Sequence, residues 1–168
     1  PTVFIRSRSK PICDVPEIGI GNQPIEGGFY LFTPEEKEQF IRVEPASERF
    51  FRRWIGSREF INRQERWCLW LGDVSPSELR SMPMVLERVE AVRAMRLESK
   101  RKATRELAAT PTRFLVENIP EQDYIVIPEV SSERREYIPI GFISADTLAS
   151  NLVKVVRDGT LYHFGVLT

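Results

Sequence analysis

Two charged side chains near the C-terminal end, Glu133 and Arg135, stand two residues apart in the stretch VSSERREYIPIGF. On an extended strand such positions point to the same face, and Arg134 between them points to the other. An arginine fork matches the O6 and N7 acceptors of guanine, and a glutamate accepts from the amino group of cytosine. The pair therefore has the chemistry to recognise a C:G base pair. The alternative is a solvated turn whose two charges form an ion pair, worth about 0–1 kcal/mol.

A second group of cationic side chains lies between Arg93 and Arg105. Six basic residues stand there against one acid, Glu98, although the whole chain balances 24 basic with 24 acidic residues. Affinity for phosphate requires excess positive charge, so the overall balance argues against a general nucleic-acid binder, while this segment keeps a local excess. The alternative for this group is a solvated basic face. The candidate DNA contacts are Lys100 and Arg101 for bases, and Arg93, Lys102, Arg105 and Arg134 for phosphates.

Patterns of catalytic residues are missing from the sequence. His163 is the only histidine, it lies between aromatic residues, and we interpret it as a packed or hydrogen-bonded structural residue. No serine stands in a G-x-S-x-G turn, no Walker-type loop occurs, and no histidine and cysteine cluster is spaced for a metal. We therefore predict no catalytic, cofactor-binding or metal-binding residue, and a unit that binds or scaffolds.

Length and composition are those of one globular domain. The chain has 168 residues, of which 42% are hydrophobic and 29% charged, and no apolar run approaches the ~20 residues of a membrane span. Cys13 and Cys68 are far apart without ligand-spaced neighbours, so we expect both to be reduced and at least partly buried in a cytoplasmic protein. The start without methionine and the end in a strand-like run predict a piece of a longer protein.

These side chains must be positioned by an α+β fold with a mainly antiparallel sheet near the end. Helix starts are predicted at Thr33 and Ser75, where a capping residue precedes proline and a glutamate, and at Ser47 before an apolar face. The spacing of Val85, Val89, Val92 and Met95 predicts one long central helix over about residues 84–108. Strands are predicted within 1–32, in RWCLWLGD, and in four runs of the last third: DYIVIPEV, YIPIGFIS, ASNLVKVV and TLYHFGVLT.

Several blocks of the sequence resemble one known family. They are similar to the target recognition region of MmeI-like proteins. The similar blocks are PICDVPEI with the later GNQPIEGG, RWCLWLGD with the helical segment through ATPTRF, VSSERREYIPIGF, and LYHFGVLT. Members of this family are bacterial adenine-specific DNA methyltransferases, often joined to an endonuclease in one restriction-modification chain. The similarity covers about residues 11–168.

This resemblance implies that a methyltransferase domain, which binds S-adenosylmethionine and holds the target adenine, precedes this segment, and that a helical part follows it. It implies that residues ahead of the YIP sequence recognise one base pair, and these align with Glu133 and Arg135. A second set of base-contacting positions resembles Lys100 and Arg101. We expect no cofactor in this segment itself, and magnesium belongs to the nuclease domain of those members that cut.

Two functions compete on these observations. In the first, residues 1–168 form a single recognition domain that binds double-stranded DNA and directs adenine N6 methylation by a catalytic domain of the same longer chain. In the second, the long helix docks a partner protein through its apolar stripe and charged flanks, without contacts to bases. The segment itself carries no catalytic motif, and any enzymatic activity belongs to the longer protein.

Overall fold

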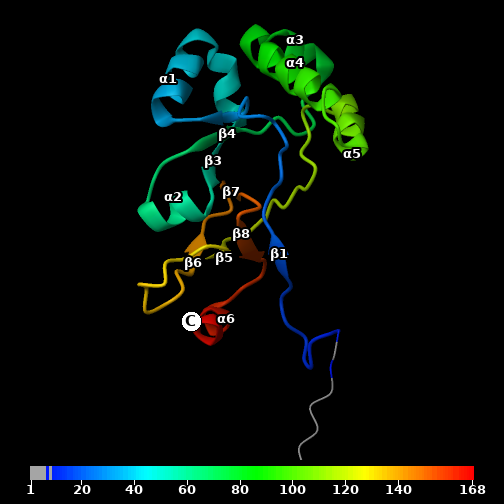
Figure 1. Cartoon of the computed structure of the whole chain (residues 1–168). Coiled ribbons are helices and arrows are strands. Elements are labelled where there is room, and N and C mark those ends of the chain that lie inside the picture. Colours follow the sequence, from blue (N-terminus) through cyan, green and yellow to red (C-terminus); the bar gives the residue numbers. More distant parts are fainter. Residues whose placement is uncertain (1–6, 8) are drawn as a thin grey trace, which may run out of the picture.

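Two four-stranded sheets organise the chain in the computed structural model, which describes residues 7 and 9–168 (Figure 1). In chain order the strands are β1 (Ile18–Ile20), β2 (Leu31–Phe32), β3 (Phe51–Ile55), β4 (Trp67–Leu69), β5 (Tyr124–Pro128), β6 (Gly141–Ile143), β7 (Thr147–Ala149) and β8 (Val153–Val156). The helices are α1 (Pro34–Val43), α2 (Ser57–Asn62), α3 (Pro76–Arg80), α4 (Pro83–Leu97), α5 (Lys102–Glu106) and α6 (Leu161–Leu167), with the 3₁₀ helices η1 (Pro45–Phe50) and η2 (Leu107–Ala109). The predicted α+β class is confirmed.

The first sheet has the order β2-β4-β3-β7, and only the β3–β7 pair is parallel. Helices α1, α3 and α4 gather at the end of the molecule nearest this sheet (Figure 1). Phe32, Phe40 and Phe51 meet edge to face in its core, with ring centroids 5.1 to 5.8 Å apart. The predicted stripe of Val85, Val89 and Val92 is buried in the same core.

The second sheet is antiparallel throughout, with the order β1-β8-β5-β6. The antiparallel sheet predicted near the end of the chain is thus confirmed. Strand β7 lies between β6 and β8 in sequence but pairs with β3, so the chain passes between the two sheets there. The fully buried Asn22 fastens this crossing, because its amide donates to the carbonyls of Asn118 (3.0 Å) and Ala149 (2.9 Å).

Two of the three predicted helix starts are confirmed. The Thr33 hydroxyl accepts from the Glu36 N–H, the Glu36 carboxylate accepts from the Thr33 N–H, and α1 begins at Pro34. Ser75 caps α3 with a single bond, because its hydroxyl accepts from the Glu78 N–H, and α3 begins at Pro76. The start at Ser47 is wrong, because a short 3₁₀ helix there leads into β3. Tertiary pairing of β3 between β4 and β7 outweighs the helical spacing of its apolar residues.

The single helix predicted over 84–108 is also corrected. Helix α4 ends at Leu97, residues 98–101 break the helix, and α5 begins at Lys102. The buried Arg96 guanidinium stabilises this changed path, because it binds the carbonyls of Leu107 and Thr110 and holds the segment after the break against α4. The apolar spacing resumes beyond the break, so the sequence pattern alone continues through it.

The last predicted strand, TLYHFGVLT, is helix α6 instead. His163 supports the helix start, because its Nδ1 accepts from the Thr160 N–H at 3.0 Å. The structural interpretation of His163 is thereby confirmed. The strand predicted in PTVFI lies outside the described residues. Cys68 is buried as expected, but the expected burial of Cys13 is wrong, because Cys13 is exposed in the segment ahead of β1; both thiols are free. None of the described helices combines the length and apolarity needed to cross a membrane.

Candidate nucleic-acid interface

The segment with Glu133 and Arg135 is a turn between β5 and β6, not an extended strand. The Arg135 N–H donates to the Ser132 carbonyl at 3.0 Å, and the Arg134 N–H lies 3.3 Å from the Ser132 hydroxyl oxygen. Strand pairing begins only at Gly141. The prediction that strand geometry aligns Glu133 with Arg135 is therefore wrong, because Glu133 and Arg134 occupy the turn itself. The solvated turn of the alternative interpretation is confirmed.

The ion pair in that alternative is not formed in the described part of the chain, where no acid–base contact within 4.0 Å includes Glu133, Arg134, Arg135 or Glu136. All four side chains are exposed. Their hydrogen-bonding groups thus face solvent without an intramolecular partner. Such groups are available to an external ligand without first breaking a contact.

The second basic group divides into side chains with different roles. Arg96 is fully buried and donates five hydrogen bonds of 2.8 to 3.0 Å to backbone carbonyls. The acceptors are the carbonyls of Pro24, Ile25, Leu107, Thr110 and Arg113. Burial lowers the pKa of the Arg96 guanidinium. This arginine contributes to the local charge excess in the sequence but holds α4, α5 and the 24–25 segment together.

The remaining basic side chains of this group are exposed. Arg93 lies 3.8 Å from Glu90, and Lys102 lies 3.7 Å from Glu106. Arg105 donates from Nη1 to the carbonyls of Ser99 (2.8 Å) and Lys100 (2.9 Å), which the break after α4 leaves open. Lys100 and Arg101 form no ion pair within the described residues, so their charges are the most available to a ligand in this group.

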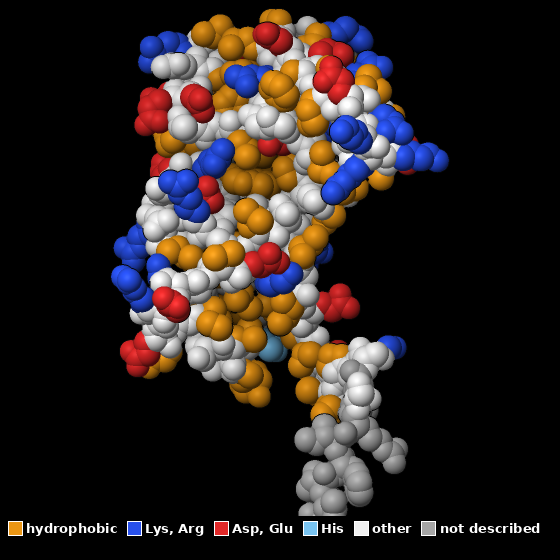
Figure 2. Space-filling view, viewed as in Figure 1, with side chains coloured by type: hydrophobic (Ala, Val, Ile, Leu, Met, Phe, Trp, Pro, Cys, Tyr) orange, Lys and Arg blue, Asp and Glu red, His pale blue; other side chains and the backbone are white. Residues whose placement is uncertain are grey.

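The two predicted sets of base-contacting residues do not form one cluster. Figure 1 shows α5 and the 132–136 turn on opposite sides of the molecule. Figure 2, in the same view, shows basic side chains gathered at both sides, with an apolar surface between them. A ligand that contacts both sets must therefore extend across the molecule, as a nucleic-acid duplex does and a small molecule does not.

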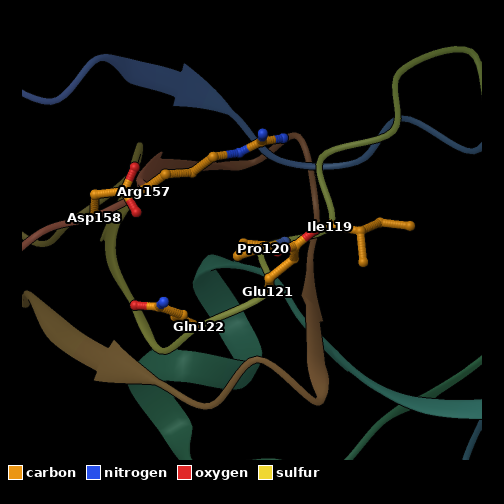
Figure 3. A pocket seen from close by; sticks show the side chains of 6 residues that line it. All are labelled: Ile119, Pro120, Glu121, Gln122, Arg157 and Asp158. Atoms are coloured by element: carbon orange, nitrogen blue, oxygen red, sulfur yellow. The ribbon is translucent and has the colours of Figure 1, made fainter.

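A small polar pocket lies between the loop after Asn118 and the end of β8 (Figure 3). Its volume is about 220 Å³, below the ~300–1,000 Å³ of pockets that enclose drug-sized ligands. The Nε of Arg157 donates to the side-chain oxygen of Asn118 at 2.5 Å, so this arginine is partly engaged. None of the predicted site residues lines the pocket. The lining residues are Ile119, Pro120, Glu121, Gln122, Arg157 and Asp158.

Sequence analysis did not single out the arginines around α2. Five arginines stand against two acids between Arg52 and Arg66, and all five are exposed. The signal was present as a local charge excess, like that of 93–105. This charge excess is less evident in the sequence because aromatic and glycine residues stand between the arginines.

The whole chain, residues 1–168, matches the family model described as "MmeI, target recognition domain". A curated relative, DNA methyltransferase A of Bacillus subtilis (strain 168), is 41% identical over 165 residues, which are 98% of this chain and 19% of the relative. A solved structure of the type IIL restriction-modification enzyme MmeI in complex with DNA superposes with a TM-score of 0.92 at 45% identity, over 98% of this chain and 22% of that one. The chain thus spans about a fifth of the length of each.

Proposed function

Because the chain belongs to the family of MmeI target recognition domains, we propose that residues 1–168 act as a single domain that recognises a short sequence in double-stranded DNA. In this proposal the domain directs adenine N6 methylation by a catalytic domain of the same longer chain. That catalytic domain supplies the S-adenosylmethionine site. The observation that carries the proposal is the TM-score of 0.92, at 45% identity, to an enzyme whose structure contains DNA.

The base contacts are assigned to four exposed side chains on two supports. Glu133 and Arg135 lie in the turn before β6, and Lys100 and Arg101 lie between α4 and α5. Arginine suits guanine and glutamate suits cytosine, so the first pair fits a C:G base pair. Four further exposed cations are assigned to phosphates, where they hold the domain in register without recognising bases. They are Arg93, Lys102, Arg105 and Arg134.

The competing proposal, a partner-docking domain, loses the feature on which it was based. The apolar stripe of the central helix was its docking face, yet Val85, Val89 and Val92 are 0 to 2% exposed. These side chains pack into the domain's own core. Docking on a catalytic domain remains part of the DNA-recognition proposal, through other surfaces.

The test is a charge exchange at the turn, Glu133→Lys with Arg135→Asp, in the longer methyltransferase that carries this domain. Methylated bases are then mapped by sequencing DNA modified by each protein. We expect the methylated motif to change at one base pair only, since each lost pairing costs about 1–3 kcal/mol of discrimination. A matched control exchanges Glu38→Lys with Arg42→Asp on α1, two exposed residues of another surface, and leaves the motif unchanged.

An identical motif from an active, folded turn variant contradicts the base-contact assignment of Glu133 and Arg135. The recognition proposal then depends on Lys100 and Arg101. If the longer wild-type protein shows neither sequence preference nor salt-dependent DNA binding, the recognition proposal itself is wrong.

A further inference from the structure

Five arginines on β3, in the short helix α2 and directly after it are exposed, so their side chains do not form part of the core. Figure 2 shows basic side chains along the side of the molecule where Figure 1 places α2. The set consists of Arg52 and Arg53 on β3, Arg58 in α2, and Arg63 and Arg66 after α2.

The acids near this set neutralise only some of its arginines. Glu65 lies 2.9 Å from Arg53, and Asp146 lies 3.6 Å from Arg52. Glu59 lies 3.6 Å from Arg66, and its other oxygen accepts from the Gly56 N–H at 3.0 Å. Within the described part of the chain, Arg58 and Arg63 have no opposite charge within 4.0 Å. We call these two the α2 arginines.

Both α2 arginines occupy positions that local physical chemistry disfavours. Arg58 lies in the first turn of a helix, where the helix dipole is positive and an acid is preferred. Arg63 ends the helix with φ at 54°, a left-handed conformation that glycine adopts with less strain. Within the described residues, neither side chain forms a hydrogen bond or ion pair that would compensate. Residues that break local rules without internal compensation are concentrated at functional sites.

Helix α2 is fixed to the sheet that presents the 132–136 turn. Phe60 of α2 packs so closely on Gly141 that a Cβ there would lie 2.8 Å from the ring. Gly141 is the first residue of β6, directly after the segment that contains the turn. The Ser57 hydroxyl also donates to the Leu152 carbonyl at 2.5 Å, ahead of β8. In Figure 1, α2 and the turn lie on the same side of the molecule.

We propose that Arg58 and Arg63 bind backbone phosphates of the duplex whose bases the 132–136 turn contacts. The inference rests on the proposed DNA recognition and adds a site to it. Two free guanidinium groups on the same side of the molecule as the turn (Figure 1) fit phosphate in charge and in hydrogen-bonding geometry. Their rigid attachment through Phe60 sets the position of the turn relative to the duplex. The α2 arginines therefore contribute to affinity and register but not to the choice of bases.

The test is the variant Arg58→Gln/Arg63→Gln in the longer methyltransferase, with duplex binding measured between 50 and 200 mM salt. Each phosphate contact contributes about −0.9 to the slope of log affinity against log salt concentration. Loss of two contacts reduces the slope by about 1.8, so the fall in affinity across this range becomes about tenfold smaller. Affinity for cognate and unrelated duplexes declines by the same factor, and the methylated motif is unchanged.

The matched control, Arg42→Gln/Arg80→Gln, also removes two exposed arginines, from α1 and α3. It keeps the wild-type slope. If the α2 variant has the same slope as this control while the wild type binds its motif specifically, the inference is overturned and the recognition proposal stands. If the wild type itself binds without sequence preference or salt dependence, both are overturned.

Discussion

Two segments, 93–105 and 52–66, both carry an excess of basic residues, but their basic side chains make different contacts in the folded chain. In 93–105, Arg96 is buried among carbonyls, Arg105 is bonded to the open end of α4, and Arg93 and Lys102 lie near acids, so of six cations only Lys100 and Arg101 have neither an ion pair nor a side-chain hydrogen bond within the described residues. In 52–66, Arg58 in α2 and Arg63 at its end remain exposed without an opposite charge among the described residues, and α2 packs against the sheet that contains β6. A charged segment is thus not in itself a binding surface. What identifies a binding surface is the number of cations left without a partner after folding.

The largest effect is expected at the buried member of the first segment. Arg96→Met removes a fully buried guanidinium that donates to five carbonyls, and we expect the free energy of unfolding to fall by about 3–5 kcal/mol, as when one partner of a buried charged contact is lost. Urea unfolding followed by circular dichroism measures it.

Arg93→Met, three residues earlier on the exposed face, is the control and is expected to change stability by less than about 0.5 kcal/mol. Equal effects of the two substitutions would remove the distinction between a structural and a surface arginine in this segment.

A second prediction concerns the attachment of α2. Gly141→Ala places a methyl group 2.8 Å from the Phe60 ring, so the ring and the helix must shift. We expect a loss of about 1–3 kcal/mol from overpacking, measured by urea unfolding. We also expect weaker DNA binding in the longer protein, since the α2 arginines move relative to the turn.

Gly19→Ala tests the same change on another strand of this sheet, where the nearest atom lies at 3.6 Å, an ordinary contact. It should not weaken DNA binding. Recovery of stability by adding Phe60→Leu to Gly141→Ala would assign the effect to this contact, and failure to recover would argue against it.

The third prediction separates base contacts from phosphate contacts at the end of α4. Lys100→Gln/Arg101→Gln should reduce the preference for the cognate duplex over a single-base variant by about 1–3 kcal/mol. Lys102→Gln should lower affinity for both duplexes equally, because phosphate contacts carry no sequence information. Competition binding with paired duplexes distinguishes them, and equal loss in both variants would contradict the assignment of Lys100 and Arg101.

Sequence reasoning predicted the elements whose signals are local. The capping box at Thr33 and the Ser75 cap fix their helix starts within one turn of chain, and the valine stripe of α4 faces the core as its spacing requires. The failures are at positions decided by distant partners. Phe51 and Trp54 have helical spacing but lie in a strand because β4 and β7 pair with β3 on its two sides.

The candidate site also combines features that the local sequence predicts with features that distant partners decide. The types of Glu133 and Arg135 could be identified from the sequence, but their turn geometry could not, since it depends on where β6 begins to pair. The inward direction of Arg96 was also beyond reach, because its acceptors at Pro24 and Arg113 come from chain segments on either side of α4. Partners distant in sequence decide which arginines remain free.

The smallest predicted effect tests whether one arginine serves both roles. Arg105 uses Nη1 for two exposed carbonyls, which leaves Nη2 for the phosphate contact proposed here. Arg105→Gln should therefore cost at most about 1 kcal/mol of unfolding free energy and reduce the salt slope by about 0.9. Arg105→Lys keeps the charge but not the fork, so we expect the stability loss with a nearly unchanged slope. If Arg105→Gln leaves the slope of the wild type, Arg105 belongs with Arg96 among the structural arginines, and the contrast with the α2 arginines becomes sharper.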